Sequence, residues 1–183
     1  MANIDVLNAK NDLLDYVNQI EYKHQLSKTV DDDYFEPGMM ENLEQYKGEY
    51  DDYNDVITLK TAVKGLRYDN RTQNLEKISV GDAVIVIRES ENVYNPNNFT
   101  VTDKFGKSLG NLPAELCNAL TPLYDSGYAE IQKSTASYIE KINERSRYAN
   151  QGVLFLELVI KLKDSHALST GITDLKISDY KTE

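Results

Sequence analysis

The sequence predicts an α+β fold: a small, mostly antiparallel β-barrel of about six strands with one or two helices, plus an N-terminal helical segment. Short apolar runs rich in β-branched residues recur between polar turns, a pattern typical of strands. One helical run with a single apolar face interrupts them. Closing a small sheet into a barrel removes the exposed edges that it would otherwise present.

Length and charge suggest how the chain is divided. Its 183 residues fit one domain with a sizeable extension. Residues 1–55 hold 14 of the 30 acidic and 4 of the 20 basic side chains, so they carry the whole net charge of −10. The acidity therefore does not argue against nucleic-acid binding by the remainder, which is neutral. We expect an acidic extension at 1–55, a barrel domain at 56–163 and a tail at 164–183.

Several classes of protein are disfavoured. No apolar run is long enough to span a membrane, and the N-terminus lacks the features of a signal peptide. The single cysteine, Cys117, excludes an intramolecular disulfide. These features favour a cytoplasmic protein. The sequence contains neither a phosphate-binding P-loop nor a serine nucleophile motif, and His24, His166 and Cys117 are too scattered for a metal site. We therefore expect no enzyme, no metal and no cofactor.

The N-terminal segment has helical spacing over residues 4–27. Pro37 suits the first turn of a second helix ending near Tyr46, and Gly48 with the acidic stretch 49–55 suggests a linker. Three roles stay open for this segment. It is a helical hairpin packed on the domain, a mask over a nucleic-acid site, or a contact surface for a protein partner.

The barrel strands follow. Residues 57–63 alternate between apolar and polar, and Gly65 indicates a bend after them. The apolar run 83–87 predicts a strand buried on both faces. Residues 99–102 predict a second strand, and a third, short one lies within 106–110. Together these three strands predict a tight meander.

The C-terminal half contains one helix and more strands. The helix is predicted after Pro113, and Cys117 lies on its apolar face. Strand signals follow at 128–141, 153–163 and, more weakly, 172–177.

Two clusters of side chains suggest binding. Tyr94 lies in a polar turn, where an aromatic ring has little reason to pack, and a nucleic-acid base can stack on such a ring. Arg67 and Tyr68 follow the predicted bend and offer a phosphate donor and a second ring. The alternative for Arg67 and Tyr68 is a surface salt bridge and a tyrosine at the core edge. Asparagines crowd the turn of Tyr94, and their alternative role is turn chemistry: Asn92, Asn95, Asn97 and Asn98.

The order of these pieces resembles the HIRAN domain, the N-terminal module of the helicase-like transcription factor and of related post-replication DNA repair translocases. The resemblance covers roughly residues 58–163. It implies a small barrel of the OB or SH3 kind with helices against it. The matching pieces are Gly65-Leu66-Arg67-Tyr68, Val84 to Arg88, Asn92-x-Tyr94-Asn95-x-x-Asn98-Phe99-x-Val101 and Leu109-Gly110-Asn111-Leu112.

The resemblance also implies a function, because HIRAN domains bind the 3′ end of single-stranded DNA. Arg67 and Tyr68 match the pair that contacts the terminal nucleotides. Tyr94 matches a stacking tyrosine, and Asn95 replaces an aspartate that accepts the 3′-hydroxyl. Departures from the pattern are Asn95 itself, Val93 in place of proline and the shifted Pro96.

The sequence thus predicts a non-catalytic module that recognises single-stranded DNA at its 3′ end, in a groove lined by Arg67, Tyr68 and Tyr94. The alternative is a protein-interaction or structural module that uses residues 1–55. Candidate nucleic-acid-binding residues are Arg67, Tyr68, Tyr94, Asn95, Asn98 and Asn111.

Overall fold

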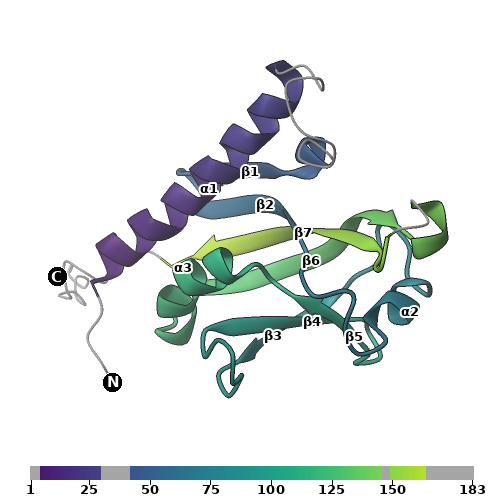
Figure 1. Cartoon of the computed structure of the whole chain (residues 1–183). Coiled ribbons are helices and arrows are strands. Elements are labelled where there is room, and N and C mark those ends of the chain that lie inside the picture. The colour runs from purple at the N-terminus through teal and green to yellow at the C-terminus, as the bar shows by residue number, and fades with distance from the viewer. Residues whose placement is uncertain (1–4, 30–41, 146–148, 164–183) are drawn as a thin grey trace, which may run out of the picture.

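Two antiparallel sheets form the centre of the protein in the computed structural model, which describes residues 5–29, 42–145 and 149–163 (Figure 1). The larger sheet has the order β1-β2-β7-β6, and the smaller sheet has the order β3-β4-β5. The strands are β1 Lys47–Asp51, β2 Val56–Ala62, β3 Ile85–Glu89, β4 Asn98–Thr102, β5 Ser108–Asn111, β6 Ala129–Glu140 and β7 Val153–Leu162. The helices are α1 Val6–Thr29, α2 Arg71–Leu75 and α3 Ala114–Asp125, with 3-10 turns η2 Leu43–Gln45 and η3 Ile142–Glu144.

Alternating apolar residues make β7 the centre of the larger sheet. It pairs with β2 on one side and with β6 on the other. The predicted strands at 57–63, 128–141 and 153–163 are therefore confirmed, each within a few residues. The apolar face of β7 is buried throughout: Leu154, Leu156, Leu158, Ile160 and Leu162.

Helix α1 covers this sheet with one narrow face. Its buried residues are Leu13, Tyr16, Val17 and Ile20, at the i, i+3, i+4, i+7 spacing of an amphipathic helix. Burial of each aliphatic side chain stabilises the fold by roughly 1.5–3 kcal/mol. The predicted helix at 4–27 is confirmed, and its core face makes it part of the packed domain.

The predicted linker after Gly48 is wrong, because Lys47–Asp51 forms strand β1 and pairs with β2. A Cβ atom on Gly48 would lie 2.3 Å from the backbone oxygen of Val17, so glycine lets α1 approach the strand closely. Glu49 and Asp51 face solvent at this sheet edge. Charges on an edge strand hide the strand pattern in the sequence and also discourage further pairing.

The predicted second helix is not found in its described part. Residues 37–41 lie outside the described residues. Beyond them the chain forms only the 3-10 turn Leu43–Gln45, and Tyr46 is already extended with ψ 140°. The Tyr46 ring packs edge-on against Phe155 at 5.0 Å between centroids, which holds the chain against the sheet instead.

Strand β3 also differs from its prediction. Its run was expected to be buried on both faces, but Ile85 and Ile87 are 42% and 45% exposed. The strand lies at the edge of the smaller sheet, and its outer face has no layer over it among the described residues. The second and third strands of the meander, β4 and β5, are confirmed.

The barrel prediction is not confirmed. The described residues form two sheets joined by isolated bridges, Lys64 with Asn111 and Ala83 with Thr135. Beyond the second bridge β3 and β6 separate, and a groove of about 530 Å³ lies between them. The α+β class with antiparallel sheets and few helices is correct.

Helix α3 is confirmed after Pro113. Cys117 is fully buried in it, and burial raises the pKa of its thiol, as expected of a small core residue.

Helix α2 was missed, because a five-residue polar helix has no measurable apolar period. The weak strand signal at 172–177 lies outside the described residues. No helix in the described ranges has the length and apolarity needed to cross a membrane.

The contact between Gly48 and Val17 predicts a stability effect. Gly48→Ala should destabilise the protein by about 2 kcal/mol, because the new methyl group meets backbone that cannot move without separating α1 from β1. Urea unfolding measures this. Glu49→Ala on the exposed side of the same strand is the matched control and should stay within about 0.5 kcal/mol of wild type. Equal stability of the two variants would contradict the close packing of α1 on β1.

Candidate nucleic-acid interface

The first part of the candidate site is the turn after β2. Lys64 N donates to Asn111 O at 2.8 Å, and Asn111 N donates to Lys64 O at 2.9 Å. Gly110 makes this approach possible, since a Cβ there would lie 2.4 Å from Lys64 O. Gly65 then turns the chain with φ +81°, as the predicted bend requires. The turn is therefore fixed to the end of β5.

Arg67 and Tyr68 project from this turn into solvent. The Arg67 guanidinium lies 4.9 Å from the centroid of the Tyr68 ring, and Nη2 donates to the Tyr68 hydroxyl at 2.6 Å. Tyr68 remains 52% exposed. The salt bridge that the sequence left as an alternative for Arg67 is not seen, because Arg67 makes no ion pair within the described residues. The half-covered Tyr68 ring remains compatible with its alternative role, a tyrosine at the core edge.

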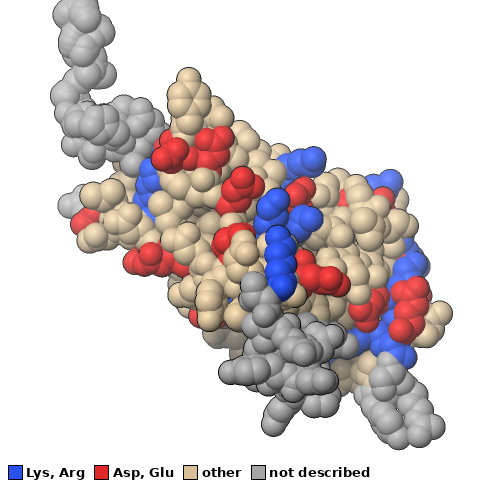
Figure 2. Space-filling view, turned by 90° about the horizontal axis from the view of Figure 1, so that it is seen from above, with Lys and Arg blue, Asp and Glu red and all other residues tan. Residues whose placement is uncertain are grey.

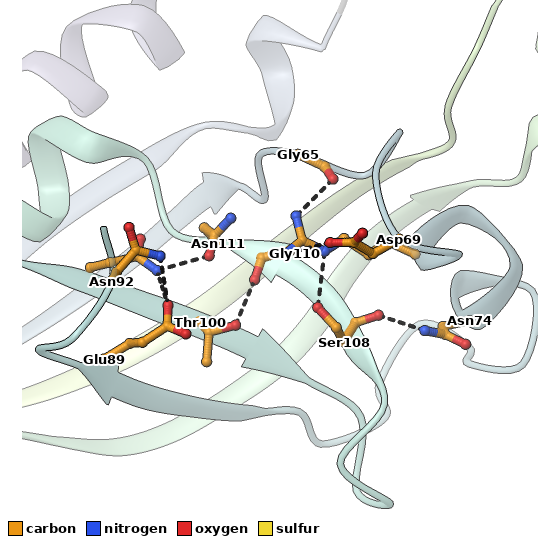
Figure 3. Close-up of polar contacts among 11 residues, drawn as sticks. Gly65, Asp69, Asn74, Glu89, Asn92, Thr100, Ser108, Gly110 and Asn111 are labelled. Atoms are coloured by element: carbon orange, nitrogen blue, oxygen red, sulfur yellow. Dashed lines mark hydrogen bonds and ion pairs between the residues drawn. The ribbon is translucent and has the colours of Figure 1, made fainter. Parts of the chain in front are cut away.

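Arg71, which the sequence analysis did not single out, supports the turn from beneath. Its Nη1 donates to Gly65 O at 3.0 Å, and its Nε donates to Ser108 Oγ at 2.9 Å. Asp69 lies 3.9 Å from the same guanidinium. Gly65, Asp69 and Ser108 accordingly lie around the Arg71 guanidinium, next to β5 (Figure 3). Arg71 fixes the Gly65 turn to the β4–β5 hairpin.

The second part is the asparagine-rich turn between β3 and β4. Asn92 Oδ1 accepts from the backbone N–H groups of Tyr94 and Asn95, both at 2.9 Å. Asn95 Oδ1 accepts from Asn97 N at 3.0 Å. Asn92 therefore acts mainly by capping the turn, which is the alternative role that the sequence left open. Tyr94 takes no part in it with its side chain, which is 94% exposed.

Asn118 of α3 anchors this turn from the side. Its Oδ1 accepts from Asn95 Nδ2 at 3.3 Å and from Asn97 Nδ2 at 3.2 Å. Arg88 holds the other side, with Nη1 donating to Pro96 O at 2.7 Å. Neither Asn118 nor Arg88 was predicted as part of the site, since their sequence positions give no sign of this proximity.

Asn98 connects the two parts. It is buried, and its Nδ2 donates to Glu89 Oε1 at 2.7 Å and to Asn111 Oδ1 at 2.9 Å. Glu89 also accepts from Asn92 Nδ2 at 2.9 Å. Figure 3 shows Glu89, Asn92 and Asn111 gathered at one end of the strands. We call the bonded group Glu89, Asn92, Asn98 and Asn111 the amide frame.

One polar group of the Asn111 side chain makes no hydrogen bond to the described residues. Its Oδ1 is used by Asn98, while its Nδ2 makes no hydrogen bond within the described residues. A Cβ on Gly65 would lie 3.5 Å from this Nδ2, so the free donor faces the turn of Arg67 and Tyr68. The structure therefore links all six predicted residues through the amide frame and the Lys64 bridge. It gives Asn98 a supporting position, leaves Arg67, Tyr68 and Tyr94 exposed, and leaves the partly buried Asn111 amide beside the Gly65 turn. The predicted groove lined by Arg67, Tyr68 and Tyr94 stays a prediction.

Acidic residues lie close to one side of this site. A shallow groove of about 390 Å³ runs between α1 and α3, and Asn118 is one of its lining residues. Asp12, Asp15 and Glu115 line it too. On the α1 side of the molecule acidic and basic side chains are interspersed, without one large basic patch (Figure 2). Charge alone does not identify a nucleic-acid surface there.

The family comparison matches the HIRAN domain model over residues 56–158. The comparison with curated proteins finds no match. Among solved structures, the crystal structure of the HIRAN domain of human HLTF is 21% identical, with a TM-score of 0.44, covering 61% of this chain and 81% of that one. A Lactobacillus plantarum protein is 23% identical, with a TM-score of 0.44, covering 58% of this chain and 98% of that one.

A third structure is the HLTF HIRAN domain in its DNA-bound conformation, solved by NMR. It is 22% identical, with a TM-score of 0.40, and the match covers 68% of this chain and 85% of that one. The family model spans more than half of this chain and includes both parts of the candidate site. The chain therefore belongs to the HIRAN domain family.

Proposed function

We propose that this protein is a non-catalytic module that binds single-stranded DNA at its 3′ end. The observation that carries the proposal is the amide frame, which together with the Lys64–Asn111 pairing connects the turns of two exposed tyrosine rings, Tyr68 and Tyr94, with a free amide donor between the frame and the Gly65 turn. Membership of the HIRAN family supports it. The DNA-bound conformation solved for HLTF belongs to that protein, and DNA binding by this chain is our proposal.

Each solvent-facing group has a distinct role in this proposal. The rings of Tyr68 and Tyr94 stack on bases, which suits single strands because every base has a π-face. The guanidinium of Arg67, already beside the Tyr68 ring, binds a phosphate. The free Nδ2 of Asn111 donates to a sugar or phosphate oxygen. Asn98 acts indirectly, by holding Asn111 and Glu89.

Asn95 is proposed to meet the strand terminus. Its Oδ1 already accepts from Asn97 N, and an amide oxygen has a second lone pair with which to accept from a 3′-hydroxyl. Its Nδ2 is directed to Asn118. Asn95 therefore offers an acceptor without the negative charge of an aspartate.

Tyr94→Ala tests the stacking role. It should weaken binding of a single-stranded oligonucleotide by about 1–3 kcal/mol without changing the melting temperature, because the ring is exposed. Fluorescence anisotropy with a labelled oligonucleotide measures the affinity. Tyr22→Ala is the control, since Tyr22 is exposed on α1 and should not affect binding. Equal affinities of wild type and Tyr94→Ala would remove Tyr94 from the interface.

Arg67→Ala tests the phosphate contact. The slope of log affinity against log salt concentration should become less steep by about 0.7, the value for one phosphate contact on a single strand. A titration series at several salt concentrations gives this slope. Lys23→Ala, which removes a charge on α1, should leave it unchanged. If neither Arg67→Ala nor Tyr94→Ala alters affinity or slope, single-strand binding at this surface is refuted.

Asn95→Asp tests recognition of the strand end. An aspartate repels a 3′-phosphate and accepts more strongly from a 3′-hydroxyl. The variant should therefore prefer the hydroxyl end more than wild type does, mainly by rejecting the phosphate. The measurement uses two oligonucleotides that differ only at the 3′ end. The same preference in both proteins would show that residue 95 does not touch the terminus.

The acidic groove allows a test of the mask hypothesis for residues 1–55. Deleting the segment would remove α1 from the core, so a change of charge alone is the better test. Asp12→Asn with Asp15→Asn should tighten binding, most clearly at low salt, because less negative charge then lies near the asparagine turn. Glu49→Gln with Asp52→Asn, on exposed positions of β1 and the β1–β2 turn, is the control matched in charge. No gain in affinity over this control would refute the mask.

A further inference from the structure

We propose that the turn between β4 and β5, residues 103–107, is a second contact for the same single strand, with a base stacked on Phe105 and phosphates bound by Lys104 and Lys107. This inference rests on the proposed function and extends it. It assigns a direction in which the strand runs from its bound end.

The turn is held rigidly by Asp103. The Asp103 N–H donates to Lys107 O at 2.9 Å, and Gly106 N donates to Asp103 O at 3.0 Å. The buried Asp103 carboxylate accepts from the N–H groups of Phe105 and Lys107, both at 2.9 Å. Gly106 supplies the positive φ of +84° that closes the turn. The backbone at the tip is thus preorganised.

The Phe105 side chain has no role in this turn. It is 78% exposed, so the fold gains little from its phenyl ring. Lys104 Nζ lies 5.3 Å from the ring centroid, and Lys107 is exposed two residues further along the same turn. An aromatic face flanked by cations is the arrangement that binds single-stranded nucleic acid without sequence preference.

The turn between β1 and β2 provides an internal comparison. Tyr53 there is 92% exposed, and Asp51 Oδ1 accepts from Tyr53 N at 3.0 Å and from Asn54 N at 3.1 Å. Both turns thus present an aromatic ring on an aspartate-capped tip. Tyr53, however, is flanked by Asp51 and Asp52, which repel phosphates. The difference in charge selects the Phe105 turn as the one that fits a polyanion.

The Phe105 turn also lies on the same hairpin as the amide frame. Strand β4 begins at Asn98, and β5 ends at Asn111, so the frame occupies one end of the hairpin and the turn occupies the other. With about 3.4 Å per residue, the five residues of β4 separate them by about 17 Å. A strand that follows this hairpin leads away from the groove of Asp12 and Asp15.

The experiment compares two oligonucleotides, of about 4 and about 12 nucleotides, which lie within the range of site sizes known for single OB folds. Phe105→Ala should weaken binding of the longer one about 5- to 100-fold and leave the shorter one unchanged. Lys104→Gln with Lys107→Gln should make the salt slope for the longer one less steep by about 1.4. Tyr53→Ala is the matched control and should alter neither affinity. Unchanged melting temperatures are expected, because all four side chains are exposed.

The outcomes separate this inference from the proposed function. If Tyr94→Ala weakens both oligonucleotides while Phe105→Ala weakens neither, the second contact is refuted and the proposed function stands. If Tyr53→Ala weakens the longer oligonucleotide as much as Phe105→Ala does, the role of charge is refuted and with it the assigned turn. If wild type binds neither oligonucleotide, both proposals fall.

Discussion

The reciprocal backbone pairing of Lys64 with Asn111 is the contact on which the rest of the structure depends. Its two hydrogen bonds join the larger sheet to the smaller one at the point where β2 ends and β5 ends. Gly110 is required there, because a side chain would collide with both Lys64 O and the Val63 side chain. The same pairing sets the turn of Arg67 and Tyr68 beside the free amide of Asn111. Fold and candidate interface therefore share one constraint.

Asparagine is abundant near this contact because its amide can satisfy backbone and side chains together. Asn92 caps the turn with its oxygen and reaches Glu89 with its nitrogen. Asn98 is buried and satisfied by Glu89 and Asn111, and a hydrogen bond to a charged group contributes about 1.5–3 kcal/mol. The half-buried Glu89 carboxylate accepts hydrogen bonds from two side-chain amides, and these bonds offset part of the cost of burying its charge. The frame thus fixes the backbone around Tyr94 while its ring stays in solvent.

Local patterns were sufficient for the elements with a clear period: α1, α3, β2, β6 and β7 were predicted close to their bounds. Local patterns failed where contacts between segments distant in the sequence determine the structure. The sequence Lys47–Asp51 looks like an acidic linker and becomes a strand only because β2 and α1 lie against it. The run 83–87 resembles a buried strand, but β3 lies at an edge. At the site the motif residues were identifiable, whereas Arg71, Glu89 and Asn118 contribute through contacts distant in sequence that no local pattern records.

The placement of charge along β4 matters more than the net charge of the chain. At its start, the asparagine turn adjoins Asn118 and the groove that contains Asp12 and Asp15. At its end, the β4–β5 turn carries Lys104, which lies over the Phe105 ring, and the exposed Lys107. Acidic side chains thus lie near one end of this hairpin and basic side chains at the other, over a distance longer than the Debye length of about 8 Å at physiological salt. In our proposal the two ends of the hairpin therefore act on different phosphates of one strand, and this sets the direction in which the strand lies.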